Sequence, residues 1–230
     1  MKTFAELGTA DDIVETLASK GINAPFPIQT LAIPLAIKGH DLIGQARTGT
    51  GKTLAFTIPI LHRVTPGDPS GKPQALVVVP TRELASQVAR DVELAGGPRG
   101  TRVLVIYGGR SYEPQLEALK KGVDVVVGTP GRLLDLANQR VLDLSHVKVL
   151  VLDEADEMLD LGFLPDIERI LKQIPDQRQA MLFSATMPDP IITLARTFMN
   201  QPTHIRAEGV QGSATHDTTA QYAYRAHALD

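Results

Sequence analysis

The sequence predicts an α/β fold with a doubly wound, mostly parallel sheet flanked by helices. Short apolar runs rich in β-branched residues alternate along the chain with longer amphipathic stretches, as strands and helices do in such folds. The runs do not alternate between apolar and polar residues, which favours strands buried on both faces and therefore a parallel sheet. The six runs are residues 41–44, 75–79, 103–106, 124–127, 147–152 and 180–183.

Helices are expected near the N-terminus and in the stretches between the strands, for example at 82–94 and 165–174. Near the N-terminus, Thr9 and Asp12 have the spacing of a capping box, in which a hydroxyl caps the first turn and a carboxylate lies three residues later. Gly21 is expected to end this helix. The carboxylates at its start are interpreted as favourable charge at a helix N-terminus rather than as catalytic acids.

The composition limits the classes of function. The chain has 230 residues, no cysteine and a net charge of −3, so disulfides and thiolate metal sites are excluded. We find neither an apolar run of about 20 residues that would cross a membrane nor a secretory signal. The sequence therefore fits a cytoplasmic protein with no membrane partner. Because a domain that binds nucleic acid by bulk charge is usually basic, any such contact here must come from a few loops.

The character of the chain changes after about Ala207. Residues 208–219 are rich in Gly, Ser and Thr, which is typical of a linker. Residues 221–226 then resemble the beginning of another strand. We expect residues 1–207 to form one domain, and residues 208–230 to be a linker followed by the start of a second, truncated domain.

A phosphate-binding loop is predicted between the strand at 41–44 and a helix that opens at Gly51. It consists of Ala46, Arg47, Thr48, Gly49, Thr50, Gly51, Lys52 and Thr53. The glycines let backbone N–H groups face phosphate oxygens; Lys52 can reach the β and γ phosphates, and the Thr53 hydroxyl can bind Mg²⁺. The alternative is a glycine-rich turn without a ligand, but the strand–loop–helix context favours a nucleoside triphosphate. The general pattern begins with glycine, where this chain has Ala46.

Two carboxylates, Asp153 and Glu154, follow the predicted strand at 147–152. Doubly wound sheets place their chemistry at the carboxyl ends of the strands. Beside a phosphate-binding loop, one carboxylate must help to hold Mg²⁺ and another must orient or deprotonate the attacking water. The order in known P-loop enzymes makes Asp153 the metal partner and Glu154 the base. The alternative is that these carboxylates are a solvent-exposed acidic cap on the strand, because two further acidic residues, Glu157 and Asp160, follow them in the sequence.

Taken together, these motifs resemble those of DEAD-box ATP-dependent RNA helicases. The matching segments are residues 21–29 with Phe4 upstream, 46–53, 80–85, 108–109, 129–132, 153–156 and 184–186. Each motif is short, but seven in this order are specific, and the resemblance covers roughly residues 4–207. It implies the N-terminal RecA-like P-loop NTPase domain of such an enzyme, with ATP and Mg²⁺ as cofactors and RNA as a partner.

The resemblance also implies roles for single residues in the nucleotide site. Gln29 would hydrogen-bond the adenine edge, which suits an amide because it both donates and accepts, and Phe4 would stack on the base. Ser184 and Thr186 would hydrogen-bond around Asp156 and couple the ATP site to RNA. Two positions depart from the family pattern: Ile22 stands where an aromatic residue is usual, and Phe26 where a hydroxyl residue is usual.

The resemblance implies that a set of loop residues grips the RNA backbone. The set is Thr81, Arg82, Gly109, Thr129, Gly131 and Arg132. Hydroxyls, backbone amides and isolated arginines suit phosphate contacts that carry no base sequence. The alternative for the two arginines is a surface ion pair.

The family's second RecA-like domain, with its arginine fingers, has no matching motif in this sequence. Such arginines are worth roughly 10³ to 10⁵ in rate, so we expect the chain alone to be a poor ATPase and no helicase. Two other classes stay open. One is a DNA-directed P-loop enzyme, against which Gln29 and residues 153–156 argue. The other is a non-catalytic module that only holds nucleotide or a partner.

Overall fold

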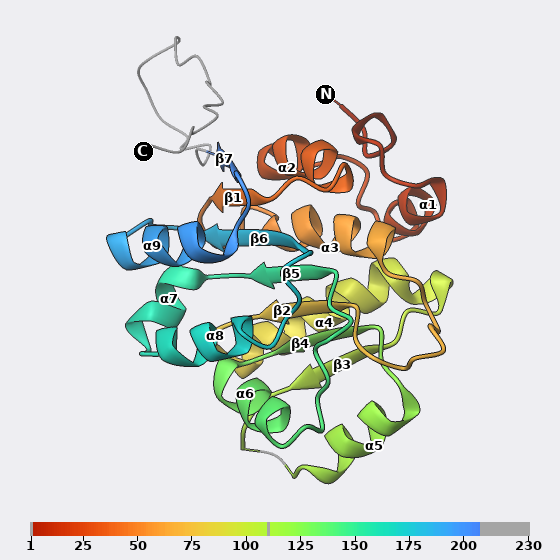
Figure 1. The fold of residues 1–230 in the computed structure, drawn as a ribbon. Coiled ribbons are helices and arrows are strands. Elements are labelled where there is room, and N and C mark those ends of the chain that lie inside the picture. The colour runs from red at the N-terminus through yellow and green to blue at the C-terminus, as the bar shows by residue number, and fades with distance from the viewer. Residues whose placement is uncertain (1, 110, 208–230) are drawn as a thin grey trace.

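The computed structural model describes residues 2–109 and 111–207, in which the strands form one parallel sheet. Their order across the sheet is β3-β4-β2-β5-β6-β1-β7 (Figure 1). Their bounds are β1 Leu42–Gln45, β2 Ala75–Val78, β3 Val103–Ile106, β4 Val125–Gly128, β5 Val149–Leu152, β6 Gln179–Ser184 and β7 Thr203–Arg206. The predicted fold class is confirmed, whereas the proposed linker at 208–230 lies outside the described residues.

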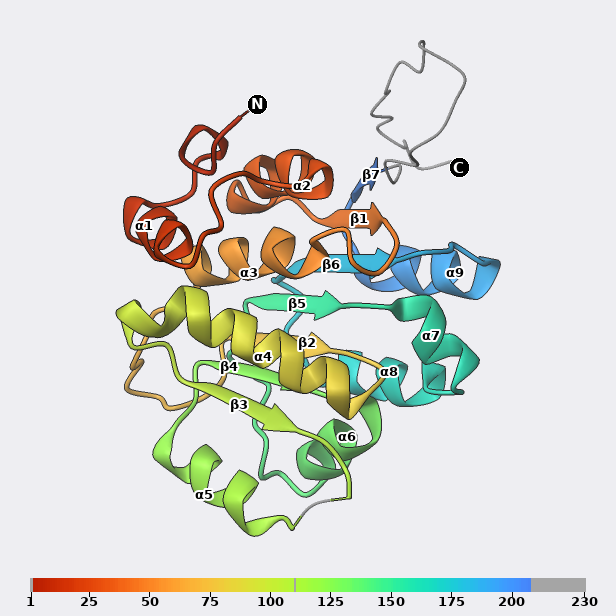
Figure 2. The same cartoon turned by 180° about the vertical axis from the view of Figure 1, so that it is seen from behind.

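Helices cover both faces of the sheet (Figures 1 and 2). One face is covered by α1 Asp11–Ser19, α2 Pro27–Ile37, α3 Lys52–Arg63 and α4 Arg82–Gly96. The other is covered by α5 Glu113–Lys121, α6 Pro130–Asn138, α7 Ala155–Asp160, α8 Leu164–Leu171 and α9 Asp189–Phe198. Two 3₁₀ turns, Ala5–Leu7 and Gly97–Arg99, complete the helical elements of the described residues.

The strands do not alternate between apolar and polar residues, and this has a direct structural cause. Val77 and Val127 belong to the core under α1–α4, whereas Leu76 and Val126 belong to the core on the opposite face. Successive side chains point to opposite faces of a sheet, so both sets must be apolar when helices cover both faces. The central strands are therefore continuous apolar runs.

The predicted strand at 147–152 is shorter in the structure and begins at Val149. The helices predicted at 82–94 and 165–174 correspond to α4 and α8; the start of α4 is as predicted, and the other ends differ by one to three residues. Strand β7 was not predicted. It lies at the edge of the sheet beside β1, and because only Ile205 of its residues is buried, its sequence lacks the apolar run of the inner strands.

The predicted capping box at Thr9 is wrong. The N-cap of α1 is Ala10, and its side chain makes no capping hydrogen bond. The Ala10 N–H instead donates to His62 Nε2 of α3, at 3.2 Å; burial lowers the pKa of His62 and so keeps this acceptor neutral. Asp12 pairs with Arg99 of the 3₁₀ turn that follows α4. Contacts with other helices, rather than a local cap, fix where this helix begins.

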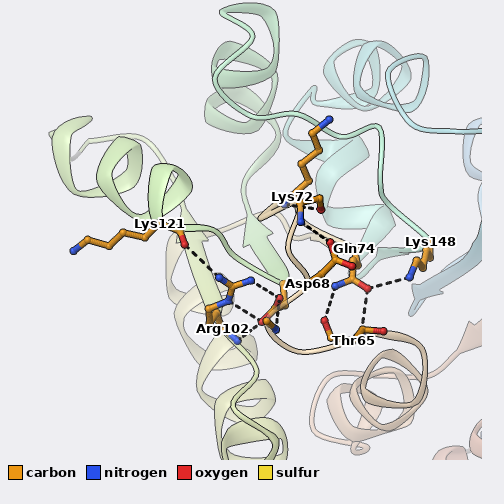
Figure 3. Close-up of polar contacts among 10 residues, drawn as sticks. Thr65, Asp68, Lys72, Gln74, Arg102, Lys121 and Lys148 are labelled. Atoms are coloured by element: carbon orange, nitrogen blue, oxygen red, sulfur yellow. Dashed lines mark hydrogen bonds and ion pairs between the residues drawn. The ribbon is translucent and has the colours of Figure 1, made fainter.

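A polar network holds the amino ends of the strands (Figure 3). Buried Asp124 accepts from Arg102 Nη2 at 2.8 Å and from the Gly67 N–H at 3.1 Å. The Gln74 amide exchanges two hydrogen bonds with the backbone of Thr65. A polar hollow of about 400 Å³ lies beside this network. Two cationic side chains that line this hollow are already in ion pairs, Lys72 with Asp143 and Arg102 with Asp124. The network is therefore best explained as one that stabilises the fold.

Within the described ranges, no helix combines the length and apolar character that a membrane crossing requires.

Candidate functional site

The predicted site residues gather at the edge of the sheet opposite this polar network, where the strands have their carboxyl ends. The phosphate-binding loop follows β1, the carboxylates Asp153 and Glu154 follow β5, and the expected coupling residues lie at the ends of β5 and β6, whereas Phe4 and Gln29 precede β1. The residues expected to bind RNA follow β2, β3 and β4. The strand order places these two groups in adjacent blocks, with β2 and β5 as neighbours. A doubly wound sheet binds its ligands at this edge, so one continuous surface carries both predicted functions.

The phosphate-binding loop has the expected strand–loop–helix geometry. Gly49 and Gly51 have φ angles of +84° and +86°, a left-handed conformation that glycine adopts without strain. A Cβ at Gly49 would meet no atom within 4 Å, so there is open space beside the loop at this position. Helix α3 begins directly after Gly51, and its N-terminal N–H groups favour an anion at this position.

Lys52 lies between the loop and the two carboxylates. Its side chain is 5% exposed, and its Nζ lies 3.6 Å from Asp153 Oδ1 and 3.9 Å from Glu154 Oε1. Both distances exceed a hydrogen bond, and Nζ has no hydrogen-bond partner among the described residues. A buried ammonium without such a partner is costly. The geometry therefore fits an anionic oxygen, such as that of a phosphate, as the missing partner.

The carboxyl group of Asp153 is suited to bind a cation. It is 2% exposed, and burial raises its pKa to about 6, although nearby Lys52 opposes the shift. A divalent cation beside this carboxyl group would favour its charged form, and Mg²⁺ prefers carboxylate and hydroxyl oxygens. Thr53 supplies a hydroxyl from the first turn of α3. These residues therefore fit the magnesium that a nucleoside triphosphate carries.

Glu154 is held in an unusual backbone conformation. It caps α7 with a φ of +52°, a strained value for a residue with a side chain. Its carboxylate accepts a hydrogen bond of 2.8 Å from Thr48 Oγ1 of the phosphate-binding loop. Sequence reasoning missed its link to Glu157, whose pKa is raised to about 7 by a hydrogen bond with Glu154. The spacing of three residues on a helix was the available signal.

Asp156, Ser184 and Thr186 form the expected hydrogen-bond cluster. The Asp156 N–H donates to Ser184 Oγ at 3.1 Å, and Asp156 Oδ2 accepts from both the N–H and the hydroxyl of Thr186. Burial alone would raise the pKa of Asp156, but the hydrogen bonds from Thr186 outweigh it and keep the group charged. The cluster joins the ends of β5 and β6, and its coupling role stays a prediction.

The side-chain amide of Gln29 makes hydrogen bonds within the protein. It is 1% exposed; Oε1 accepts from the Phe26 N–H and Nε2 donates to the Gly51 carbonyl, both at 2.9 Å. A Cβ at Gly51 would lie 2.6 Å from that Nε2, so Gln29 packs directly under the phosphate-binding loop. Phe4 is 2% exposed within the core, whereas Phe26 is 55% exposed. Base stacking by Phe4 would therefore require its segment to move.

The residues expected to contact RNA lie at the ends of β2, β3 and β4. Thr81 caps α4 by accepting the Leu84 N–H at 3.2 Å. Arg82 forms an exposed ion pair with Glu83, which is the alternative that the sequence left open for this arginine. An exposed ion pair is weak, so a phosphate could displace Glu83 from Arg82. Gly109 and Gly131 are exposed, with open space where a Cβ would stand, and Thr129 is the N-cap of α6. Arg132 lies over the ring of Tyr112, a neighbour that sequence reasoning missed.

Comparison with known proteins identifies the family. The family model described as "DEAD/DEAH box helicase" matches residues 26–194. The chain belongs to the DEAD/DEAH box helicase family. It is 49% identical over 214 residues to the ATP-dependent RNA helicase CshA of Listeria monocytogenes, covering 93% of this chain and 41% of that protein. It is 50% identical over 208 residues to the CshA of Geobacillus kaustophilus, covering 90% of this chain and 44% of that protein.

Solved structures agree with this assignment. A DEAD box protein from Methanococcus jannaschii is similar with a TM-score of 0.85 and 42% identity, over 90% of this chain and 56% of that one. A protein from Sulfolobus tokodaii described as a hypothetical ATP-dependent RNA helicase gives a TM-score of 0.78 and 38% identity, over 86% of this chain and 57% of that one. The predicted resemblance and the RecA-like fold are thus confirmed. The DEAD-box chain spans less than half the length of the two CshA relatives.

Proposed function

We propose that this chain is the ATP-binding and RNA-binding domain of an ATP-dependent RNA helicase that remodels RNA duplexes or RNA–protein complexes. The observation that carries the proposal is Lys52, a buried ammonium without a hydrogen-bond partner among the described residues. It points to an anionic ligand between the glycine loop and two carboxylates. The relatives, which are named ATP-dependent RNA helicases, add ATP and RNA.

In the proposed mechanism, Lys52 and the N–H groups of the loop bind the phosphates. Thr53 and Asp153 hold Mg²⁺, which neutralises charge on the phosphate oxygens when it is bound. Glu154 orients the attacking water and takes its proton. Because the Thr48 hydroxyl donates to Glu154, the loop that binds phosphate also positions the base.

RNA is proposed to lie across the ends of β2, β3 and β4, gripped by its sugar-phosphate backbone. The groups offered there are hydroxyls, exposed glycine backbone and two arginines, which read no base. This local arrangement explains how a chain with a net charge of −3 can hold a polyanion. The cluster around Asp156 would report the state of the nucleotide to this surface.

A second RecA-like domain is proposed to complete both sites. ATP can drive remodelling only if it binds one arrangement of two bodies more tightly than another. The chain alone offers one wall of the ATP site, without the arginines that act on the transferring phosphoryl group. It is therefore expected to bind nucleotide, to hydrolyse it slowly and not to unwind a duplex.

Adenine selectivity tests the nucleotide assignment. We expect the chain to bind ADP roughly ten-fold more tightly than GDP, because Gln29 can exchange its hydrogen bonds with the protein for a matched pair on the adenine edge. Competition against a fluorescent ADP analogue measures both affinities. Gln29→Glu, which keeps the shape and loses the donor, should reduce the preference. Equal affinity for the two nucleotides would refute base reading by Gln29 while leaving the phosphate site in place.

A further inference from the structure

Phe26 is an exposed aromatic residue beside the phosphate-binding loop. It is 55% exposed, and every other aromatic residue that the structure describes is buried or half-buried. A Cβ at Gly51 would lie 2.6 Å from Phe26 Cδ2, the same distance as from Gln29 Nε2. The edge of the Phe26 ring therefore lies against the last glycine of the loop.

The backbone that carries this ring is held firmly. The Phe26 N–H donates to Gln29 Oε1 at 2.9 Å, and the Phe26 carbonyl accepts from the N–H and the hydroxyl of Thr30 at 3.0 and 3.2 Å. Pro27 favours an extended conformation in the residue before it, and Phe26 has a ψ of +161°. Both polar groups of the backbone are thus occupied and its torsion is restricted, so the ring is presented from a fixed position and little ordering is needed on binding.

The ring lies where the base of a bound nucleotide is proposed to be. Gln29, the residue proposed to read the base, makes hydrogen bonds to Phe26 on one side and to Gly51 of the loop on the other. A nucleotide with its phosphates on the loop and its base at Gln29 therefore brings that base next to Phe26. An aromatic side chain stacks favourably on the flat face of any base.

The other candidate for stacking is less accessible. The family resemblance assigns the stacking ring to Phe4, but Phe4 is 2% exposed and belongs to the core, so its segment would have to move. Phe26 needs no such movement. Exposure alone does not mark a site, because single apolar residues are common on protein surfaces. The combination of exposure, a fixed backbone and contact with both Gln29 and Gly51 distinguishes Phe26.

We propose that Phe26 supplies the aromatic face on which the nucleotide base stacks. This inference rests on the proposed nucleotide function of the loop and adds a residue to its base-binding part. The family pattern has a hydroxyl residue at this position, which offers no such face. Gln29 provides the preference for adenine, whereas Phe26 strengthens the binding of any base.

Substitutions at Phe26 test this inference. Calorimetry measures the affinity of wild type and Phe26→Leu for ADP, GDP and inorganic pyrophosphate, and thermal melting reports folding. Leucine keeps apolar bulk and removes the aromatic face, so we expect ADP and GDP to bind roughly five- to ten-fold more weakly, the lower part of the range for loss of base stacking. The ratio of the two affinities should not change, and pyrophosphate, which has no base, should bind as it does to wild type. Val141→Ala, at an exposed apolar residue after α6, is the control and should bind all three as wild type does.

Phe26→Trp provides a direct signal. The chain contains no tryptophan, so the variant has a single indole, which retains a face for stacking. Its affinity for ADP should match or exceed that of wild type. Its fluorescence should be quenched by ADP and unaffected by pyrophosphate, because only ADP places a base on the ring.

The outcomes separate this inference from the proposed function. If a folded Phe26→Leu protein binds ADP as tightly as wild type does, the stacking role is wrong while the nucleotide site stands. If the variant loses affinity for ADP and pyrophosphate equally, Phe26 supports the loop rather than the base, and the inference is overturned. If wild type binds none of the three ligands, the proposed nucleotide function fails and the inference fails with it.

Discussion

Replacing Lys52 with alanine is expected to weaken nucleotide binding roughly 10- to 100-fold, the range for loss of a charge-assisted hydrogen bond. The buried Nζ of Lys52, at the start of the helix that follows the glycine loop, has no hydrogen-bond partner among the described residues. The side chains that lie within 4 Å of it in ion pairs, Asp153 and Glu154, carry the opposite charge. Those carboxylates would also repel the phosphates once Lys52 is gone.

Titration with a fluorescent ADP analogue measures this effect. Lys172→Ala, at an exposed position after α8, is the matched control and should bind as wild type does. Melting curves establish that the Lys52 variant is folded. Unchanged affinity in a folded Lys52→Ala protein would remove the loop at residues 46–53 from the nucleotide site.

Replacing Glu154 with glutamine is expected to abolish most ATP hydrolysis and to spare ATP binding. A carboxamide has the shape of the carboxylate but cannot take a proton from water, and loss of a general base typically costs roughly 10² to 10⁴ in rate. The substitution retains an oxygen that can accept from Thr48, so the loop contact at 2.8 Å survives. Glu157 loses the carboxylate that raises its pKa to about 7, so this pKa should fall in the variant.

Steady-state turnover in the proposed two-domain protein, together with binding of a labelled ATP analogue, tests the assignment. Asp160→Asn changes one exposed carboxylate on the same helix and should leave both measurements unchanged. Turnover of the Glu154→Gln variant within a few-fold of wild type would mean that another group is the base. The roles of Asp153 and Glu154 would then need to be exchanged or reassigned.

The parts that the sequence predicted well share a physical origin. The phosphate-binding loop and the residues after β5 are continuous segments whose place in the structure follows from their position after a strand. Parallel strands bring such segments to one edge whatever the details of the loops. The apolar runs were equally clear because each inner strand is covered on both faces.

The parts that the sequence did not predict depend on contacts between distant residues. Ala10 begins α1 because its N–H meets His62, which is 52 positions away. Strand β7 is recognised by its pairing with β1 rather than by its own residues. The burial of Phe4, the engagement of both ends of the Gln29 amide, and the stacking of Arg132 on Tyr112 also follow from tertiary packing. No spacing rule in a single sequence contains that information.

The most direct test of the account is RNA-dependent ATP turnover, because the central claim is that this chain forms one half of an RNA-stimulated ATPase. Hydrolysis is measured for the 230-residue chain and for the longer protein that is proposed to include a second RecA-like domain, each without nucleic acid, with single-stranded RNA and with DNA of the same sequence. The account predicts slow turnover by the chain under every condition, and strong stimulation of the longer protein by RNA but not by DNA. Equal stimulation by DNA, or rapid RNA-stimulated turnover by the chain alone, would contradict it.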